Sequence, residues 1–125
     1  MKNTEKLVRS VLGPTRIKVR PLVLAIETME YLLFEEGMYR DDIMVTKDIY
    51  PVVAKRLNKS EAAVSRSIAR TVSQCWCCGD AAQMAKIVGR ELKDIYLVSD
   101  LLFYFAYYRH HMKPYYAPAR CRKKQ

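Results

Sequence analysis

Apolar residues recur at helical spacing through the first third of the chain. From Arg16 to about Glu36 they return every three or four positions, which is the period of one face of an α-helix. The apolar residues on that face are Leu22, Ile26, Met29 and Leu33. Pro21 fits the first turn of a helix and Gly37 is suited to end one, so the pattern predicts a helix here. Residues 1–14 are more polar and end in a Gly-Pro turn signal, and we expect them to form an N-terminal arm.

Two helical patterns separated by a short break follow in the centre of the chain. The first covers residues 46–57 and starts at a threonine, a candidate N-cap. Asn58 tolerates the left-handed conformation that ends a helix, and Ser60 is a favourable N-cap for the next one. The second pattern covers residues 61–78, and Gly79 is a natural C′ residue after it.

The remaining pattern is also helical. It predicts a short helix that ends at Gly89 and a last helix over Lys93–Met112, whose inward residues are Val98, Leu102 and Phe105. No stretch alternates with the period of a strand. We therefore predict an all-α fold, a compact single-domain bundle of about five to six helices, with a helix-turn-helix over about residues 46–78. The domain is expected to span residues 15–113, followed by a basic tail over residues 114–125.

The helix expected at residues 61–78 has two different faces. At about 100° per residue, the apolar face contains Val64, Ile68, Thr71, Val72 and Cys75. The opposite face carries Ala62, Arg66, Ala69, Arg70, Ser73 and Cys77. Such a helix buries one side and offers the solvent small residues near its start and two arginines one turn apart.

These residue types fit the recognition helix of a helix-turn-helix. An arginine can donate two hydrogen bonds to guanine, and small side chains let a helix approach the major groove. The candidate base-reading residues are Arg66, Arg70, Ser65 and Ala62. The candidate backbone-contacting residues are Lys47, Lys55, Lys59, Ser60 and Ser73. Periodicity and charge alone leave a helical hairpin with a solvated basic face equally open.

The chain is strongly basic for its length. It has 125 residues, with 22 Lys and Arg against 13 Asp and Glu, which gives a formal net charge of +9. This balance favours a polyanionic partner, which can be DNA, RNA or an anionic membrane surface. For a recognition helix the expected partner is double-stranded DNA. The N-terminus has no apolar run of signal-peptide length, and no stretch is long and apolar enough to span a bilayer. We therefore expect a cytoplasmic protein without a membrane partner.

The segment Val45–Gly79 also resembles a known family. It carries Thr46, Lys47, Tyr50, Pro51, Ala54, Lys55, Arg56, Leu57 and Asn58, and further on Val64, Arg66, Ile68, Trp76 and Gly79. In these residues and their spacing it is similar to the C-terminal effector domain of stage zero sporulation protein A, the response regulator that starts sporulation in endospore-forming bacteria. The flanking stretches GPTRIK and AKIVG resemble the family more weakly.

The resemblance implies an all-helical bacterial domain with no catalysis, no cofactor and no small-molecule substrate. It implies binding to short boxes of the TGTCGAA type, often in tandem, with head-to-tail contacts between neighbouring copies, and it leaves a homodimer open. The family pattern has an acidic residue where this chain has Ser65, and a second reading arginine where it has Ala69. Arg70 lies next to Ala69 but points about 100° away on a helix. The alternative is an interaction module that dimerises with or antagonises a full-length regulator, with degraded or non-specific DNA binding.

The family joins this domain to an N-terminal receiver domain. Residues 1–14 are too short for a receiver, so we expect a stand-alone effector or an excised domain. Phosphorylation control of the usual kind then has no acceptor within these residues.

Other side chains give weaker signals. The run Cys75–Cys78 and the pair His110–His111 have no second pair at ligand spacing, so no metal site is expected. No nucleophile elbow or Gly-rich phosphate loop is present, so an enzyme is not expected. The last helix is rich in aromatic residues: Phe103, Tyr104, Phe105, Tyr107 and Tyr108, with Tyr115 and Tyr116 after it. Self-association, ordinary packing and stacking on single-stranded bases all remain open for them.

Overall fold

The computed structural model describes residues 3–13, 16–90 and 97–116. Over these residues the chain is helical and contains no β-strand. The α-helices are α1 (Asn3–Leu12), α2 (Arg20–Glu30), α3 (Tyr50–Leu57), α4 (Glu61–Cys78), α5 (Ala81–Val88) and α6 (Val98–His111). Between α2 and α3 lie the shorter helical segments η1 (Tyr31–Glu35), η2 (Arg40–Asp42) and η3 (Val45–Ile49). The predicted all-α fold is confirmed.

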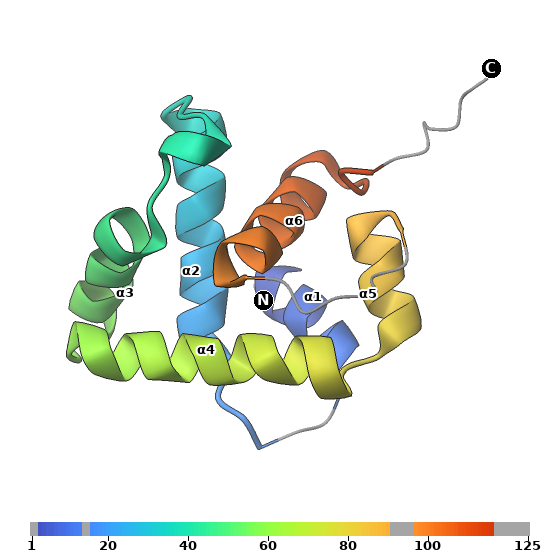
Figure 1. Cartoon of the computed structure of the whole chain (residues 1–125), viewed down its shortest axis with the longest axis horizontal. Coiled ribbons are helices and arrows are strands. Elements are labelled where there is room, and N and C mark those ends of the chain that lie inside the picture. Colours follow the sequence, from blue (N-terminus) through green and yellow to red (C-terminus); the bar gives the residue numbers. More distant parts are fainter. Residues whose placement is uncertain (1–2, 14–15, 91–96, 117–125) are drawn as a thin grey trace.

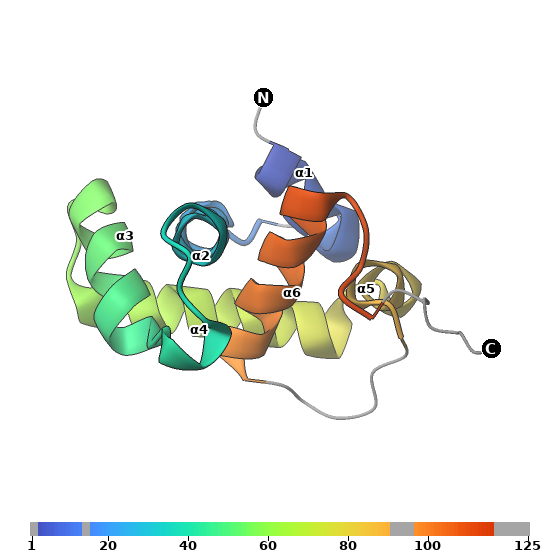
Figure 2. The same ribbon diagram turned by 90° about the horizontal axis from the view of Figure 1, so that it is seen from above.

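Helix α4 runs along one side of the molecule, and the other helices stand on it (Figure 1). Helix α3 lies at the start of α4, α2 and α6 cross its middle part, and α1 and α5 lie towards its end (Figure 1). Seen from above, α2 lies between α3 and α6 (Figure 2). Because α1, α2, α3 and α6 all contact α4, its inner face is covered along its length.

The last helix is the centre of the core. Leu101, Leu102, Phe105 and Ala106 are completely buried, and α6 contacts α1, α2, α4 and α5. Phe103 and Tyr104, on another side of the same helix, are buried as well. A helix that is apolar around most of its circumference has to be covered on most sides. The inward positions predicted for Leu102 and Phe105 are confirmed, whereas Val98 in the first turn is only partly buried.

The N-terminal segment is not the polar arm that its sequence suggested. It forms helix α1, whose Thr4, Val8 and Val11 are buried. These positions are four and three residues apart, so they form one narrow stripe on an otherwise polar helix. A stripe of three residues does not stand out among basic and polar neighbours, and a helix this short depends on packing for its stability. Helix α1 therefore belongs to the core, where it contacts α2, α4, α5 and α6.

The helix predicted over Arg16–Glu36 begins later than expected. Helix α2 starts at Arg20 with a proline in its first turn and continues through η1, and Gly37 then adopts a φ of +72°. The segment before it has alternating burial, with Val19 buried and Lys18 exposed. Residues 16–19 therefore form a bent lead into α2, with Val19 as its N-cap, rather than its first turn.

The start of the first motif helix also differs from expectation. Thr46 was the expected N-cap, but the helical segment already begins at Val45. The carboxylate of Asp48 accepts a hydrogen bond from the Met44 N–H at 2.8 Å and so occupies the capping role. A carboxylate is a stronger acceptor than a threonine hydroxyl, particularly beside the positive end of a helix.

The last helix was expected from Lys93 to Met112. The structure has it from Val98, and its expected beginning at residues 93–96 lies outside the described residues. The Asp100 carboxylate accepts a hydrogen bond from the Leu97 N–H at 3.1 Å, which caps the helix at this point. Met112 ends it in the left-handed conformation, with a φ of 60°.

The beginning of the expected C-terminal tail folds back onto the domain. The Tyr116 N–H donates a hydrogen bond to the Val88 carbonyl at 3.1 Å. Gly89, which ends α5 with a φ of 102°, has no room for a side chain, since a Cβ there would lie 2.5 Å from the Tyr116 carbonyl oxygen. Residues 117–125 of the expected tail lie outside the described residues.

Candidate nucleic-acid interface

Helix α4 is held by its apolar face. The residues that the helical wheel places on that face, Val64, Ile68, Thr71, Val72 and Cys75, are all buried. Burial raises the pKa of the Cys75 thiol to about 12, so the thiol stays neutral and packs as a small apolar group. At the end of the helix, Gly79 allows close packing, because a Cβ there would lie 2.6 Å from a methyl group of Val11. The opposite face of α4 therefore points to solvent in a fixed orientation.

The turn between α3 and α4 is fixed by its own hydrogen bonds. Asn58 adopts the left-handed conformation, with φ 56° and ψ 48°. The Lys59 N–H donates to the Ala54 carbonyl at 3.0 Å. Ser60 Oγ accepts a hydrogen bond from the Ala63 N–H at 3.1 Å and caps α4. The predicted conformation of Asn58 and the predicted cap at Ser60 are both confirmed.

The solvent-facing side of α4 has the residues that the wheel predicts, and we call it the reading face. Its exposed residues are Ala62, Arg66, Ala69, Arg70 and Ser73. Neither Arg66 nor Arg70 forms an ion pair with any other described residue, so both guanidinium groups are available to a ligand. Because the alanine side chains beside the arginines are short, the backbone of α4 can approach a partner closely.

Ser65 lies at the edge of the reading face rather than on it. Its side chain is partly buried. Burial raises the pKa of Tyr50, and the nearby Ser65 side chain offsets part of that rise. Because Ser65 is engaged with the first residue of α3, its hydroxyl is less available to a ligand than the arginines are.

The candidate phosphate-binding residues surround the beginning of α4. Lys47 lies in η3, Lys55 on α3, Lys59 in the turn and Ser60 at the N-cap, and all four side chains are exposed. Ser73 is exposed on the reading face about two turns after Arg66.

Residues 31–96, just over half of the chain, match the family model of the sporulation initiation factor Spo0A C terminal. The chain belongs to this family. Its members are DNA-binding transcription regulators of the sporulation type and not enzymes, so double-stranded DNA is the partner of this domain. No curated protein and no solved structure shows significant similarity to the chain.

The family match covers the whole helix-turn-helix. It extends from η1 through α3, α4 and α5, and therefore includes the AKIVG stretch on the C-terminal side. The GPTRIK stretch on the N-terminal side lies outside the matched residues. The described part of the chain also contains no helix long and apolar enough to cross a membrane.

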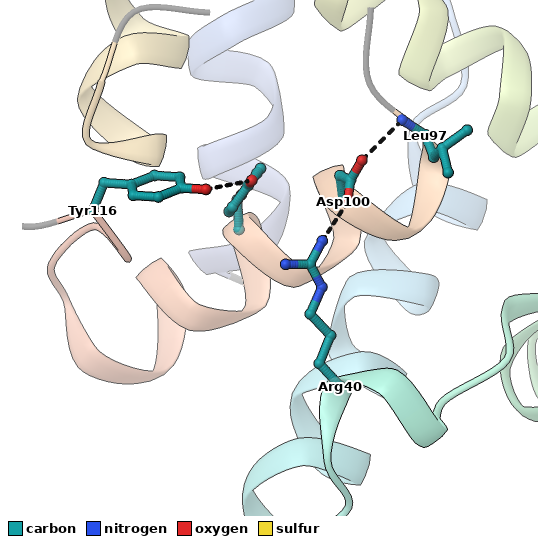
Figure 3. A network of polar contacts seen from close by, with 5 residues as sticks. Arg40, Leu97, Asp100 and Tyr116 are labelled. Carbon is teal, nitrogen blue, oxygen red and sulfur yellow. Dashed lines mark hydrogen bonds and ion pairs between the residues drawn. The ribbon is translucent and has the colours of Figure 1, made fainter.

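Cations at the far end of the molecule from α4 are used inside the fold. Figure 3 shows the guanidinium of Arg40, on η2, paired with the carboxylate of Asp100 at the start of α6. The Arg40 guanidinium also lies over the Phe103 ring, 4.3 Å from its centroid. In the same region Arg109 pairs with Glu30 at 2.8 Å. The Arg40–Asp100 pair anchors the segment between α2 and α3 onto α6, and the Arg109–Glu30 pair joins α6 to the end of α2.

The aromatic residues of the last helix are largely packed. The hydroxyl groups of Tyr104 and Tyr116 lie 3.2 Å apart (Figure 3). Tyr107, which the sequence left open as an interface residue, is partly buried among rings, with centroid distances of 6.2 Å to Phe34 and 5.3 Å to Tyr115. Edge-to-face arrangements of this kind stabilise a fold. Packing therefore accounts for most of this cluster.

The cysteines and histidines do not assemble into a ligand set within the described residues. Cys77 and Cys78 are exposed, whereas Cys75 is buried. His110 stacks on Phe34 with ring centroids 4.1 Å apart and lies 3.3 Å from the Glu30 carboxylate. The described residues contain no group of three side chains placed to hold a metal ion.

The segment before α2 carries three cations that the sequence did not indicate as candidate site residues. Arg16, Lys18 and Arg20 are exposed and lie beside α4, lining the same surface grooves as Ser67 and Arg70. The sequence signal was the alternation of basic and apolar residues in Arg-Ile-Lys-Val-Arg, which is the period of an extended segment. Because the pattern predicts a helix from Arg16 onwards, the alternation did not stand out.

Proposed function

We propose that this domain recognises short DNA boxes of the TGTCGAA type by inserting α4 into the major groove. The observation that carries this proposal is the position of Arg66. Its side chain is exposed at the centre of the reading face, has no ion-pair partner among the described residues, and projects from a helix whose other face is fixed in the core. Arginine donating to guanine O6 and N7 is the commonest specific contact in the major groove.

The other residues have supporting roles in the proposal. Arg70 makes a further base or phosphate contact, and Ala62 rests against a base edge or a thymine methyl group. The backbone contacts come from Lys47, Lys55, Lys59, Ser60 and Ser73, which fix the register of α4 without reading sequence. Ser65 has a minor role, because its side chain is partly buried beside Tyr50.

Because Ala69 stands where the family has a second reading arginine, the DNA box of this domain should differ in part from the family's box. A methyl group cannot replace the hydrogen bonds of a second reading arginine, so we expect relaxed preference at one base pair. The interaction-module alternative would require a reading face that no longer discriminates bases. The exposed Arg66 and the family assignment both favour DNA reading over that alternative.

Replacing Arg66 by Ala should lower the affinity for the box by roughly 10- to 100-fold and flatten the preference at one guanine. A bidentate arginine–guanine pair contributes about 1–3 kcal/mol of discrimination, and the fold should survive because the side chain is exposed. Fluorescence anisotropy on the box, on each single-base variant and on a scrambled duplex measures both effects.

Lys59→Ala is the matched control for this experiment. It removes one exposed cation near the start of the same helix, and it should weaken binding to every sequence by a similar factor while leaving preference unchanged. If Arg66→Ala also weakens all sequences equally, Arg66 is only a phosphate contact and base reading must come from elsewhere on α4. Equal binding of the unaltered protein to box and scrambled DNA would overturn the proposed function.

For association on tandem boxes we propose the segment between α2 and α3 as the contact. Tyr39 and Met44 on this segment are 79% and 56% exposed, whereas Tyr107 is engaged with other rings. Tyrosine and methionine are enriched at protein interfaces. A homodimer or a head-to-tail pair both remain compatible with this surface.

Tyr39→Ala should reduce cooperative binding to two adjacent boxes several-fold and leave affinity for one box intact. Tyr107→Ala should instead lower the melting temperature, because it removes ring contacts inside the domain. Gel shifts on one-box and two-box duplexes, with thermal melts of both variants, separate the two roles. Unchanged cooperativity in Tyr39→Ala would rule out this segment as the contact.

A further inference from the structure

A cationic groove runs along one edge of the reading face of α4. It consists of two adjoining parts with volumes of about 410 Å³ and about 210 Å³. Lys18 and Ser67 line both parts, which makes the groove continuous. The cations that line it are Arg16, Lys18, Arg20, Lys59 and Arg70. The groove therefore combines two residues already assigned to the interface with three that are not.

The three additional cations are held on a well-anchored segment. Val19 is buried in the core between the exposed Lys18 and Arg20, and its carbonyl accepts a hydrogen bond from the Val23 N–H at 2.9 Å, which ties the segment to α2. Val19 is buried, whereas Arg16, Lys18 and Arg20 are exposed, so the segment turns its valine towards the core and its cations towards solvent. The segment leads into α2 at the side of α4, as Figure 1 shows.

The α4 side of the groove is made of small residues. Ala63 and Ser67 line it and are four residues apart, so they lie on one edge of the helix, one turn from each other. Short side chains at this edge leave space between the helix backbone and the cations opposite. The groove is therefore open, and the side chains that line it do not fill it.

The charge of the groove is not neutralised by the protein. No described aspartate or glutamate lines either part, and none of the five cations forms an ion pair with a described residue. The next depression along α2 is also lined by Lys18 and Arg20, together with Glu5 and Glu27, so these two cations have carboxylates on their other side. A row of cations without ion pairs beside α4 attracts an extended polyanion.

Most of the groove lies on the edge of the reading face that faces away from Ser65, and only its second part reaches Leu57 at the end of α3. On a helical wheel, Ser67 is about 100° to one side of Arg66, and Ser65, which contacts Tyr50 of α3, is about 100° to the other side. A helix in the major groove, which is about 12 Å wide, has one sugar–phosphate backbone on each side. Lys47, one turn before Tyr50, serves the α3 side.

We propose that the groove holds the phosphates of the DNA strand opposite to the one contacted from the α3 side. Arg16, Lys18 and Arg20 are then backbone-binding residues, and α4 is clamped between two strands rather than supported along one. The inference rests on the proposed docking of α4 in the major groove. The three residues precede residues 31–96, the stretch that matches the family.

The test compares two triple variants with the same loss of charge. One carries Arg16→Ala, Lys18→Ala and Arg20→Ala; the control carries Lys6→Ala, Lys86→Ala and Lys113→Ala, whose exposed side chains do not line the groove. Binding to a TGTCGAA-type duplex and to a scrambled duplex is measured over a series of NaCl concentrations. The slope of log K against log [NaCl] should become shallower by about 2–3 in the groove variant and by less than about 1 in the control. The ratio of box to scrambled affinity should not change in either variant.

A second measurement resolves the strand. Single methylphosphonate substitutions remove the charge of one phosphate at a time on each strand of the box duplex. The unaltered protein should lose affinity at positions on both strands, and the groove variant should become insensitive on one strand only. Equal slopes in the two triple variants, or sensitivity that the groove variant keeps on both strands, overturns the inference. If the unaltered protein binds box and scrambled DNA equally, the proposed base reading fails, and the difference between the two slopes still decides whether the groove binds phosphates.

Discussion

Raising the NaCl concentration from about 50 mM to about 200 mM should weaken binding to a box-containing duplex by about a thousandfold. The exposed cations around α4 replace the counterions of the DNA, and each phosphate neutralised adds about 0.9 to the slope of log K against log [salt]. About six phosphates, contacted through residues such as Lys47, Lys55 and Lys59, give the expected drop. Fluorescence anisotropy with a labelled duplex measures it directly.

A scrambled duplex is the control for the salt experiment. Its affinity should be lower at every concentration but should fall with a similar slope, because phosphates are the same in both duplexes. The difference between the two curves is the part of the affinity that depends on base reading. A nearly flat response on the box would contradict a backbone-clamping role for the lysines around α4.

Replacing Phe105 by Ala should destabilise the domain by about 3–5 kcal/mol. The side chain is completely buried in α6, the helix that contacts α1, α2, α4 and α5, so its removal leaves a cavity where four helices meet. For a domain of this size, that loss corresponds to a fall in melting temperature of about 10–20 °C. Thermal and urea unfolding followed by far-ultraviolet circular dichroism measure the change.

Leu97→Ala is the control for the core substitution. Leu97 precedes the first turn of the same helix and its side chain is 72% exposed, so its replacement should change stability by less than about 0.5 kcal/mol. Comparable melting temperatures for Phe105→Ala and Leu97→Ala would contradict the central position of α6. The Phe105→Ala domain should still bind the box at low temperature, where the folded fraction is high, because Phe105 does not reach the reading face.

The recognition helix was predictable because its signals are local. The Ser60 cap depends on a hydroxyl three residues before the N–H that it accepts from, and the left-handed Asn58 depends on its own side chain. The two faces follow from the 3.6-residue period, which applies to any helix that packs on one side. The exposure of Arg66 and the burial of Val64 could therefore be read without knowing what covers α4.

Long-range packing decided the features that the sequence concealed. Helix α1 shows only a three-residue stripe, and its burial depends on four helices far along the chain. Ser65 is predicted as a base-reading residue, and only the structure shows that its side chain is partly buried beside Tyr50 of the neighbouring helix. Gly79 matched a C-cap by type, yet it has an ordinary negative φ of −77°, and the tight contact with Val11 explains the need for a glycine.

The sequence by itself determined the all-α class, the bounds and N-cap of α4, and the residues of its exposed face. Each of these depends on side chains within one or two turns of one another. Only the tertiary structure decided that Arg16, Lys18 and Arg20 lie along α4, since a buried Val19 and the path into α2 bring them there from about 50 residues away in the sequence. Charge near a binding surface depends on which segments the core brings together, and that information is spread over the whole chain.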